Sequence, residues 1–138
     1  MAAQTRSLVA FAHVADVERS IRFYADLGFE VGNRVRSDDV RSDDVQSDEV
    51  PPEGGTMTVW AWLHSEKANL MVGLADEPVD PQRQAVLFYL YFDDIQATRD
   101  ALVGLGHAPG AICHPFYMPG GECRLLDPDG YVLMLAQI

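Results

Sequence analysis

Residues 8–28 have the sequence LVAFAHVADVERSIRFYADLG, and residues 86–106 repeat its pattern as VLFYLYFDDIQATRDALVGLG. In each copy an apolar run leads to an aspartate, Asp16 or Asp94, and the segment closes on Leu-Gly. The apolar run predicts a strand, the aspartate suits the N-cap of a helix, and the glycine suits a helix C-terminus. The chain therefore contains one strand–helix unit twice, at an offset of 78 in the numbering.

A second match extends the repeat towards the end of each copy. Residues 68–72 (ANLMV) correspond to residues 131–135 (YVLML), here at an offset of 63. Each copy has the order strand, helix and three strands, so we predict an α+β fold of two tandem βαβββ modules that share a groove within one domain, residues 1–138. The expected strands are residues 8–14, 29–35, 58–63, 68–74, 87–92, one near Ala111, 122–126 and 131–137, and the expected helices are residues 17–27 and 95–105.

One segment accounts for the change in offset. Residues 36–50 consist of three pentads, RSDDV, RSDDV and QSDEV, whose combined length equals the fall in offset from 78 to 63. A period of five suits neither a helix nor a strand. We therefore expect an acidic insertion over residues 36–55, which is either a solvated loop or a lid that attracts cations. Module 1 then covers about residues 7–75 and module 2 about residues 86–138, with a Pro-containing linker at residues 76–84.

Composition limits the kinds of partner. The 138 residues carry 21 acidic and 10 basic side chains, a net charge of −11. Nucleic acid needs a basic surface, so we expect no nucleic-acid partner, whereas a cationic ligand is compatible with this charge. No stretch approaches the roughly 20 apolar residues of a membrane span, and no basic segment followed by an apolar run begins the chain. We expect a cytoplasmic protein without a membrane partner, in which Cys113 and Cys123 are reduced.

The motifs of both copies resemble the vicinal oxygen chelate superfamily, which includes glyoxalase I, extradiol dioxygenases, fosfomycin resistance enzymes and bleomycin resistance proteins. The resembling stretches are DVERSIRFY at residues 16–24, LGF at residues 27–29 and DPDGY at residues 127–131. The resemblance implies that each module is a curved four-stranded sheet with its helix outside, and that two modules form an eight-stranded mixed sheet shaped like a cup. Because one fold carries several chemistries, the fold alone assigns no activity.

Metal-dependent members of the superfamily place metal ligands on the first and last strands of each module. Carried onto this chain, these positions are Val9, Met71, Leu87 and Met134. A divalent cation needs His, Asp, Glu or Cys ligands; Val and Leu offer none, and a thioether is a weak, soft donor. We therefore expect no metal, no other cofactor, and an apolar, adaptable floor in the cup.

Strand alternation selects the side chains expected to face the cup. Phe11 and His13 share a face with Val9, and Tyr89 shares one with Leu87. Aromatic side chains elsewhere, and a loop rich in aromatic residues, Pro and Gly at residues 114–121, extend the set. The candidate ligand-binding residues are Phe11, His13, Trp60, Trp62, Met71, Tyr89, His114, Tyr117, Arg124 and Met134.

The register of the two hairpins decides some of these candidates. A bulged turn ending at Gly130 directs Arg124 inward together with Glu122, whereas a two-residue turn directs Cys123 inward instead; the position of the glycine favours the bulged turn. An inward arginine would need an anionic partner. The register of the first hairpin stays open, so Trp60 and Trp62 face either the cup or the helix.

Several candidates also have a structural interpretation. His13 suits a structural histidine or a general base. The two tryptophans suit either a core or a stacking platform. The loop at residues 114–121 either overhangs the groove or only connects two strands.

Three functions remain. The leading hypothesis is a metal-free protein similar to the bleomycin resistance branch, which sequesters an aromatic or cationic ligand such as an antibiotic. The resemblance to that branch also implies a homodimer. The alternative is a metal-independent lyase, isomerase or hydrolase that uses His13 or Tyr89 for proton transfer near Arg124. A third hypothesis is a regulatory member that binds a protein through its sheet edges. No nucleophile or phosphate-loop motif names a reaction.

Overall fold

The computed structural model describes residues 3–39 and 56–138. Residues 40–55, with most of the acidic pentads, lie outside the described residues, so the lid hypothesis is not addressed. The chain divides into two compact units, Met1–Val79 and Asp80–Ile138, with the boundary inside the expected linker. Within the part of the chain that is described, no helix is long and apolar enough to cross a membrane.

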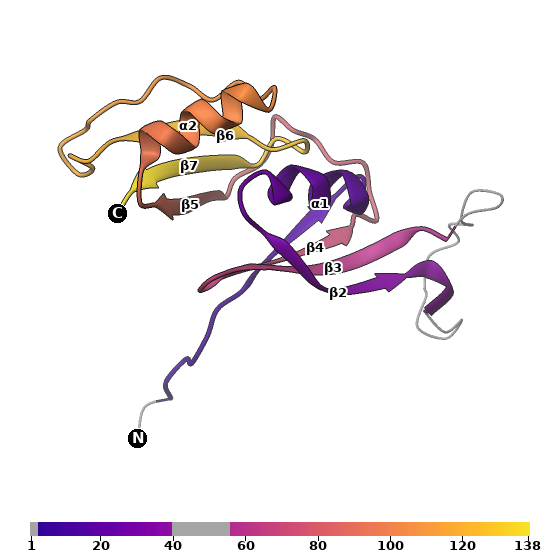
Figure 1. Cartoon of the computed structure of the whole chain (residues 1–138). Coiled ribbons are helices and arrows are strands. Elements are labelled where there is room, and N and C mark those ends of the chain that lie inside the picture. Colours follow the sequence, from indigo (N-terminus) through magenta and orange to yellow (C-terminus); the bar gives the residue numbers. More distant parts are fainter. Residues whose placement is uncertain (1–2, 40–55) are drawn as a thin grey trace. The chain divides into compact units, whose positions relative to one another are not determined.

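Unit 1 is a four-stranded sheet with one helix packed on it (Figure 1). Its elements are β1 (Ala10–Val14), α1 (Val17–Ala25), β2 (Glu30–Arg36), a 3₁₀ turn (Ser37–Asp39), β3 (Thr58–Ser65) and β4 (Ala68–Leu74). The strands lie in the order β1-β4-β3-β2. β1 pairs with β4 in parallel, and the other neighbours are antiparallel. This is the predicted βαβββ module.

Unit 2 repeats the plan with one strand fewer. Its elements are β5 (Leu87–Phe92), α2 (Ile95–Gly104), β6 (Glu122–Leu126) and β7 (Val132–Gln137). The strands lie in the order β5-β7-β6, with β5 and β7 parallel. The strand expected near Ala111 is reduced to a single bridge between Cys113 and Glu122. The described residues thus form sheets of four and three strands in place of the eight strands predicted.

Both helices begin at the predicted caps. The Asp16 side chain accepts a hydrogen bond from the backbone N–H of Arg19 at 3.1 Å, and Asp94 accepts one from Ala97 at 3.0 Å. Each cap satisfies an N–H group that the helix leaves without a partner and contributes about 1 kcal/mol. The chain leaves each helix through a Leu-Gly pair whose glycine has a φ of 94°.

The parallel strand pairs have the same register in both units. Phe11 lies opposite Met71 in unit 1, and Tyr89 lies opposite Met134 in unit 2. The first strands of the two pairs are related by the offset of 78 and the last strands by the offset of 63. The sequence repeat is therefore a repeat of strand pairing.

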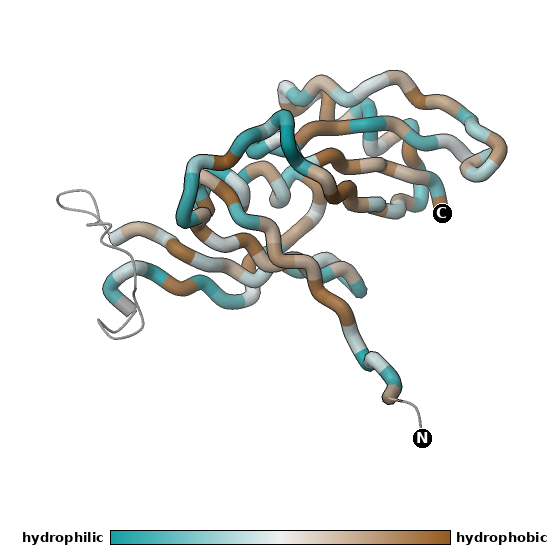
Figure 2. The backbone as a smooth tube through the Cα atoms, turned by 180° about the vertical axis from the view of Figure 1, so that it is seen from behind, coloured by the Kyte–Doolittle hydropathy of each residue, from teal (hydrophilic) through white to brown (hydrophobic). Residues whose placement is uncertain are grey.

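One face of each sheet packs against the helix of its own unit; we call the other the helix-free face. The buried side chains come from alternate strand residues and from the inner side of each helix, and Figure 2 shows the apolar stretches along the strands. Their removal from water is the main stabilising contribution to each unit. The core includes Ala12, Val14, Tyr24, Ala61, Leu63 and Val72 in unit 1, and Leu102, Cys123, Leu125, Leu133 and Leu135 in unit 2.

A two-residue turn settles the register of the first hairpin. Between β3 and β4 the turn consists of Glu66 and Lys67, and Glu66 adopts a φ of 50° although it is not a glycine. The resulting register pairs Trp62 with Met71. Since Ala61 and Leu63 are the residues of this strand buried under the helix, alternation directs Trp60 and Trp62 to the helix-free face.

The second hairpin has the bulged turn that the sequence favours. The Gly130 N–H donates to the carbonyl of Asp127 at 3.1 Å, and Gly130 has a φ of 85°. The Asp127 side chain also accepts from the backbone N–H groups of Asp129 and Tyr131, at 2.8 and 2.9 Å. Arg124 consequently pairs in the predicted register and lies on the helix-free face.

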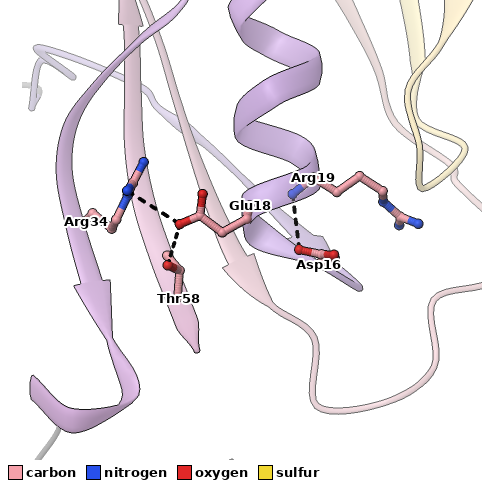
Figure 3. A network of polar contacts seen from close by, with 5 residues as sticks. All are labelled: Asp16, Glu18, Arg19, Arg34 and Thr58. Carbon is pink, nitrogen blue, oxygen red and sulfur yellow. Dashed lines mark hydrogen bonds and ion pairs between the residues drawn. The ribbon is translucent and has the colours of Figure 1, made fainter. Parts of the chain in front are cut away.

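A polar contact joins α1 to its sheet (Figure 3). The Glu18 carboxylate accepts a hydrogen bond from the Thr58 hydroxyl at 2.6 Å, and the same oxygen lies 3.5 Å from Nη1 of Arg34. A register shift between Val35 and Arg36, where β2 pairs with β3, brings Thr58 to the helix side. The contact fixes how the first turn of α1 lies on the sheet.

Candidate functional site

The helix-free face of unit 1 carries all five candidate residues of that unit in two neighbouring rows. The two tryptophans and the methionine are partly exposed, and the Phe11 side chain is 45% exposed. Exposed aromatic side chains gathered on a rigid sheet are typical of a binding surface. We call Phe11, His13, Trp60, Trp62 and Met71 the aromatic face. Strand pairing places Phe11, Met71 and Trp62 side by side in one row across the sheet, and His13, Gly73 and Trp60 in the next row.

A glycine makes room for one of these rings. A Cβ atom on Gly73 would lie 2.3 Å from Cζ of Phe11, so any larger residue would displace the ring. The ring of His13 lies next to it, with 4.9 Å between the ring centroids. Phe11 and His13 therefore form a pair close to the sheet, and a side chain at Gly73 would disturb it.

The indole of Trp62 is oriented by a hydrogen bond. Its Nε1 donates to Oδ1 of Asn69 at 3.1 Å, and the amide of Asn69 donates to the carbonyl of Lys67 at 3.4 Å. The hairpin turn thereby fixes the indole through the hydrogen bond of its N–H group. An aromatic ring held in this way loses little conformational freedom when a flat ligand stacks on it.

The helix-free face of unit 2 has matching rows with different chemistry. Tyr89 and Tyr91 are 41% and 56% exposed, and their rings stack with centroids 6.2 Å apart. Arg124 is exposed as well, so it lacks the burial that would demand an anionic partner. One row across the sheet consists of Tyr89, Met134 and Arg124, and the next consists of Tyr91, Ala136 and Glu122.

Glu122 is the buried charged residue on this face. Its side chain is 2% exposed, and its Oε1 accepts a hydrogen bond from the hydroxyl of Tyr117 at 3.1 Å. Tyr117 belongs to the loop at residues 114–121, which therefore folds over the edge of the sheet. The sequence placed Glu122 on the inward face but did not single it out, because burial by a loop has no periodic signal.

The tyrosines near this carboxylate hold their protons strongly. Partial burial raises the pKa of Tyr89, and the Glu122 carboxylate raises it further. The hydrogen bond to Glu122 and the charge of that group raise the pKa of Tyr117. Tyr89 is therefore protonated at neutral pH and suits a hydrogen-bond donor, not a general base.

His114 has a structural contact within its loop. Its Nδ1 lies 3.0 Å from the carbonyl oxygen of Pro119, which can only accept, so Nδ1 carries the proton. The Met118 N–H also donates to the carbonyl of Pro115 at 2.9 Å. His114 lies outside the two rows and holds the loop that carries Tyr117.

The four positions implied for metal ligands do not fit a divalent cation. Met71 and Met134 lie on the helix-free faces, Leu87 begins β5, and Val9 precedes β1. None has an oxygen, nitrogen or thiolate donor. Among the described residues no group of three or more His, Cys, Asp or Glu side chains is arranged to hold a metal ion.

A family model matches almost the whole chain, in agreement with the observed fold. The family model described as Glyoxalase/Bleomycin resistance protein/Dioxygenase superfamily matches residues 8–135. The chain belongs to this superfamily. No match was found among curated proteins.

Solved structures share the fold at low sequence identity. A bleomycin-binding protein complexed with bleomycin has a TM-score of 0.68 at 18% identity, over 97% of this chain and 99% of its own. TnmS3, an antibiotic binding protein from Streptomyces sp. CB03234, has 0.65 at 21%, over 99% and 98%. FosX, a fosfomycin resistance protein from Mesorhizobium loti, has 0.64 at 13%, over 96% and 92%. These likenesses establish the fold, and the ligand must be inferred from the residues of this chain.

Proposed function

We propose that this protein binds and sequesters an aromatic or cationic small molecule, such as an antibiotic, without a metal. The observation that carries the proposal is the aromatic face of unit 1, where exposed rings lie in two rows and one indole is held by a hydrogen bond. Two proteins of the same fold, described as binding bleomycin and an antibiotic, support this class of ligand.

The aromatic face suits a flat ligand. Stacked aromatic pairs contribute about 0.5–1.5 kcal/mol each beyond the burial of their area. Phe11 on β1 and Trp60 and Trp62 on β3 offer three ring systems on the two strands that flank β4. Met71 lies between two of these strands, and its flexible thioether adapts to an irregular ligand surface.

The charge of the chain favours a cationic group on the ligand. A net charge of −11 attracts cations over a distance and speeds their association. Metal-dependent capture lacks suitable donors at Val9, Met71, Leu87 and Met134, so stacking and charge are the interactions available for binding.

Calorimetry with bleomycin and a panel of other cationic antibiotics tests the proposal. At least one is expected to bind with a dissociation constant near micromolar or below, unchanged by EDTA. Trp62→Ala should weaken that binding about tenfold or more, because it removes a stacked ring. Val103→Ala, an exposed apolar residue of α2, is the matched control and should bind as the wild type does. Absence of binding across the panel would refute the proposal.

We also propose a homodimer, which the resemblance to the bleomycin resistance branch implies. Light scattering of the purified chain should then give twice the 15.3 kDa of one chain. A monomeric mass across the micromolar range would contradict this part of the proposal and leave ligand binding to be tested by itself.

A further inference from the structure

Glu122 occupies the position in unit 2 that a tryptophan occupies in unit 1. Trp60 lies opposite Gly73, and Glu122 lies opposite Ala136, at equivalent places in the two registers. Unit 2 thus has a carboxylate where unit 1 has an indole. Glu122 is 2% exposed, and burying a charge is unfavourable unless it is paired and hydrogen-bonded.

Only one oxygen of this carboxylate is satisfied by the described residues. Oε1 accepts the hydrogen bond from Tyr117. Oε2 is fully buried and has no hydrogen-bond partner among the residues that the structure describes. Partial burial and interaction with the Glu122 carboxylate raise the pKa of Tyr89, so this phenol lies near the carboxylate although it does not donate to Oε2. A buried acceptor in this state is unfavourable, and a donor from a ligand would relieve it.

Two tyrosine hydroxyls interact with the same carboxylate, and a third tyrosine shares its row. Tyr91 shares its row, and the Tyr91 ring stacks with that of Tyr89 at an interplanar angle of 25°. The charge of Glu122 contributes to the raised pKa values of Tyr89 and Tyr117, so both phenols lie within its field. Ring faces attract cations, and the attraction grows when water is excluded.

A donor with a positive charge suits this position best. An anion would be repelled, and a neutral hydroxyl would leave the buried charge without a counter-charge. A metal ion needs several donors, whereas no group of three His, Cys, Asp or Glu side chains is arranged for one in the described ranges. A protonated amine or a guanidinium group supplies N–H donors, a charge and a surface that aromatic faces accept.

We propose that Glu122, with Tyr89, Tyr91 and Tyr117, forms a subsite in unit 2 for a protonated amine or guanidinium group of the ligand. The proposal rests on the proposed binding function and deepens it by naming the chemical group recognised and the residue that recognises it.

The neighbouring Arg124 allows a test in which the effect on cation binding has the opposite sign. Arg124 lies on the same face of β6, one alternation further along the strand than Glu122, and is exposed. Its charge opposes a cation bound at Glu122. Removing that charge with Arg124→Gln should strengthen binding of a cation, whereas removing the charge of Glu122 with Glu122→Gln should weaken it.

The test compares benzylamine, which is protonated at neutral pH, with benzyl alcohol, which has nearly the same shape and no charge. Both are titrated into the ¹⁵N-labelled full chain, and the backbone amides of residues 89, 117 and 122 are followed by NMR. Benzylamine should bind about tenfold or more tightly than benzyl alcohol. Glu122→Gln should weaken benzylamine about tenfold and change benzyl alcohol less than twofold, and Arg124→Gln should strengthen benzylamine.

Equal affinity of the two probes for the wild-type chain would overturn the subsite, and so would benzylamine affinity unchanged by Glu122→Gln. The wild-type comparison needs no variant, so it decides the matter even if Glu122→Gln fails to fold. Bleomycin binding together with equal probe affinities would refute the subsite and retain the proposed function. Absence of binding for the antibiotic panel and both probes would refute both.

Discussion

Phe11 and Gly73 fit together as a ring and the space left by a missing side chain, since a Cβ on Gly73 would lie 2.3 Å from Cζ and 2.7 Å from Cε1 of the ring. Gly73→Ala should therefore displace Phe11 and lower the free energy of unfolding by about 1–3 kcal/mol, as overpacking does elsewhere. Urea denaturation measures the change.

A double-mutant cycle separates this clash from any backbone effect. In a Phe11→Ala background, Gly73→Ala should be neutral or stabilise by about 0.4–1 kcal/mol, because alanine reduces the freedom of the unfolded chain. A cost that persists without the Phe11 ring would show that the glycine is required for another reason.

The contact between Glu18 and Thr58 makes a second prediction. Thr58→Val keeps the shape of the side chain and removes the donor to the carboxylate, so it should lower the free energy of unfolding by about 1–2 kcal/mol. Arg34→Met should cost less, about 0–1 kcal/mol, because that ion pair is partly exposed. Both are measured by thermal and urea unfolding.

An exposed threonine serves as the control for this substitution. Thr56→Val changes the same atoms at an exposed position just before β3 and should leave stability within about 0.5 kcal/mol of the wild type. Equal costs at both sites would show that the hydrogen bond of Thr58 contributes nothing specific.

The periodic part of this structure was predictable from the sequence. The two aspartate caps, the helix-ending glycines and the paired offsets fix where strands and helices begin, because each depends on local chemistry or on alternation. The bulged turn at Gly130 was predictable for the same reason, since a positive φ there favours glycine. The position of Arg124 on the sheet followed directly from that turn.

Features without a periodic signal were not predictable. The first hairpin turns at Glu66, a residue with no preference for a φ of 50°, so the faces of Trp60 and Trp62 stayed open. The strand expected near Ala111 is a single bridge between Cys113 and Glu122. Glu122 is buried and accepts a hydrogen bond from Tyr117 of the loop at residues 114–121, and no pattern in β6 indicates a contact with that loop.

Three glycines of unit 2 should respond differently to alanine. Gly130 has a φ of 85°, and an added Cβ would lie 2.4 Å from the carbonyl oxygen of Pro81, so Gly130→Ala should cost more than about 2 kcal/mol. Gly106 has a φ of 94° with open space around it, so Gly106→Ala should cost only about 1–2 kcal/mol. Gly104 ends α2 with neither constraint, so Gly104→Ala should stabilise by up to about 1 kcal/mol.

Thermal unfolding of the three variants gives the order directly. The expected order of stability is Gly104→Ala above the wild type, then Gly106→Ala, then Gly130→Ala. Equal losses for the last two would mean that the contact with Pro81 adds nothing to the strain of a positive φ.

The tyrosines beside Glu122 make the protein sensitive to high pH. Partial burial and the Glu122 carboxylate raise the pKa of Tyr89 above its ordinary 10.0, and the hydrogen bond and charge of Glu122 raise that of Tyr117. A group with a raised pKa in the folded state contributes stability that is fully present below pH 10 and is lost as the pH rises through the raised value. The free energy of unfolding should therefore decrease above pH 10.

Glu122→Gln tests this cause, because it removes the charge and keeps an oxygen that can accept from Tyr117. The variant should ionise Tyr89 and Tyr117 at lower pH, followed by NMR of ¹³Cζ-labelled tyrosine, and its stability should depend less steeply on pH above 10. Asp100→Asn on α2 removes an equal charge from an exposed residue and should leave both tyrosines as in the wild type. Identical tyrosine titrations in Glu122→Gln and the wild type would mean that Glu122 does not control these phenols.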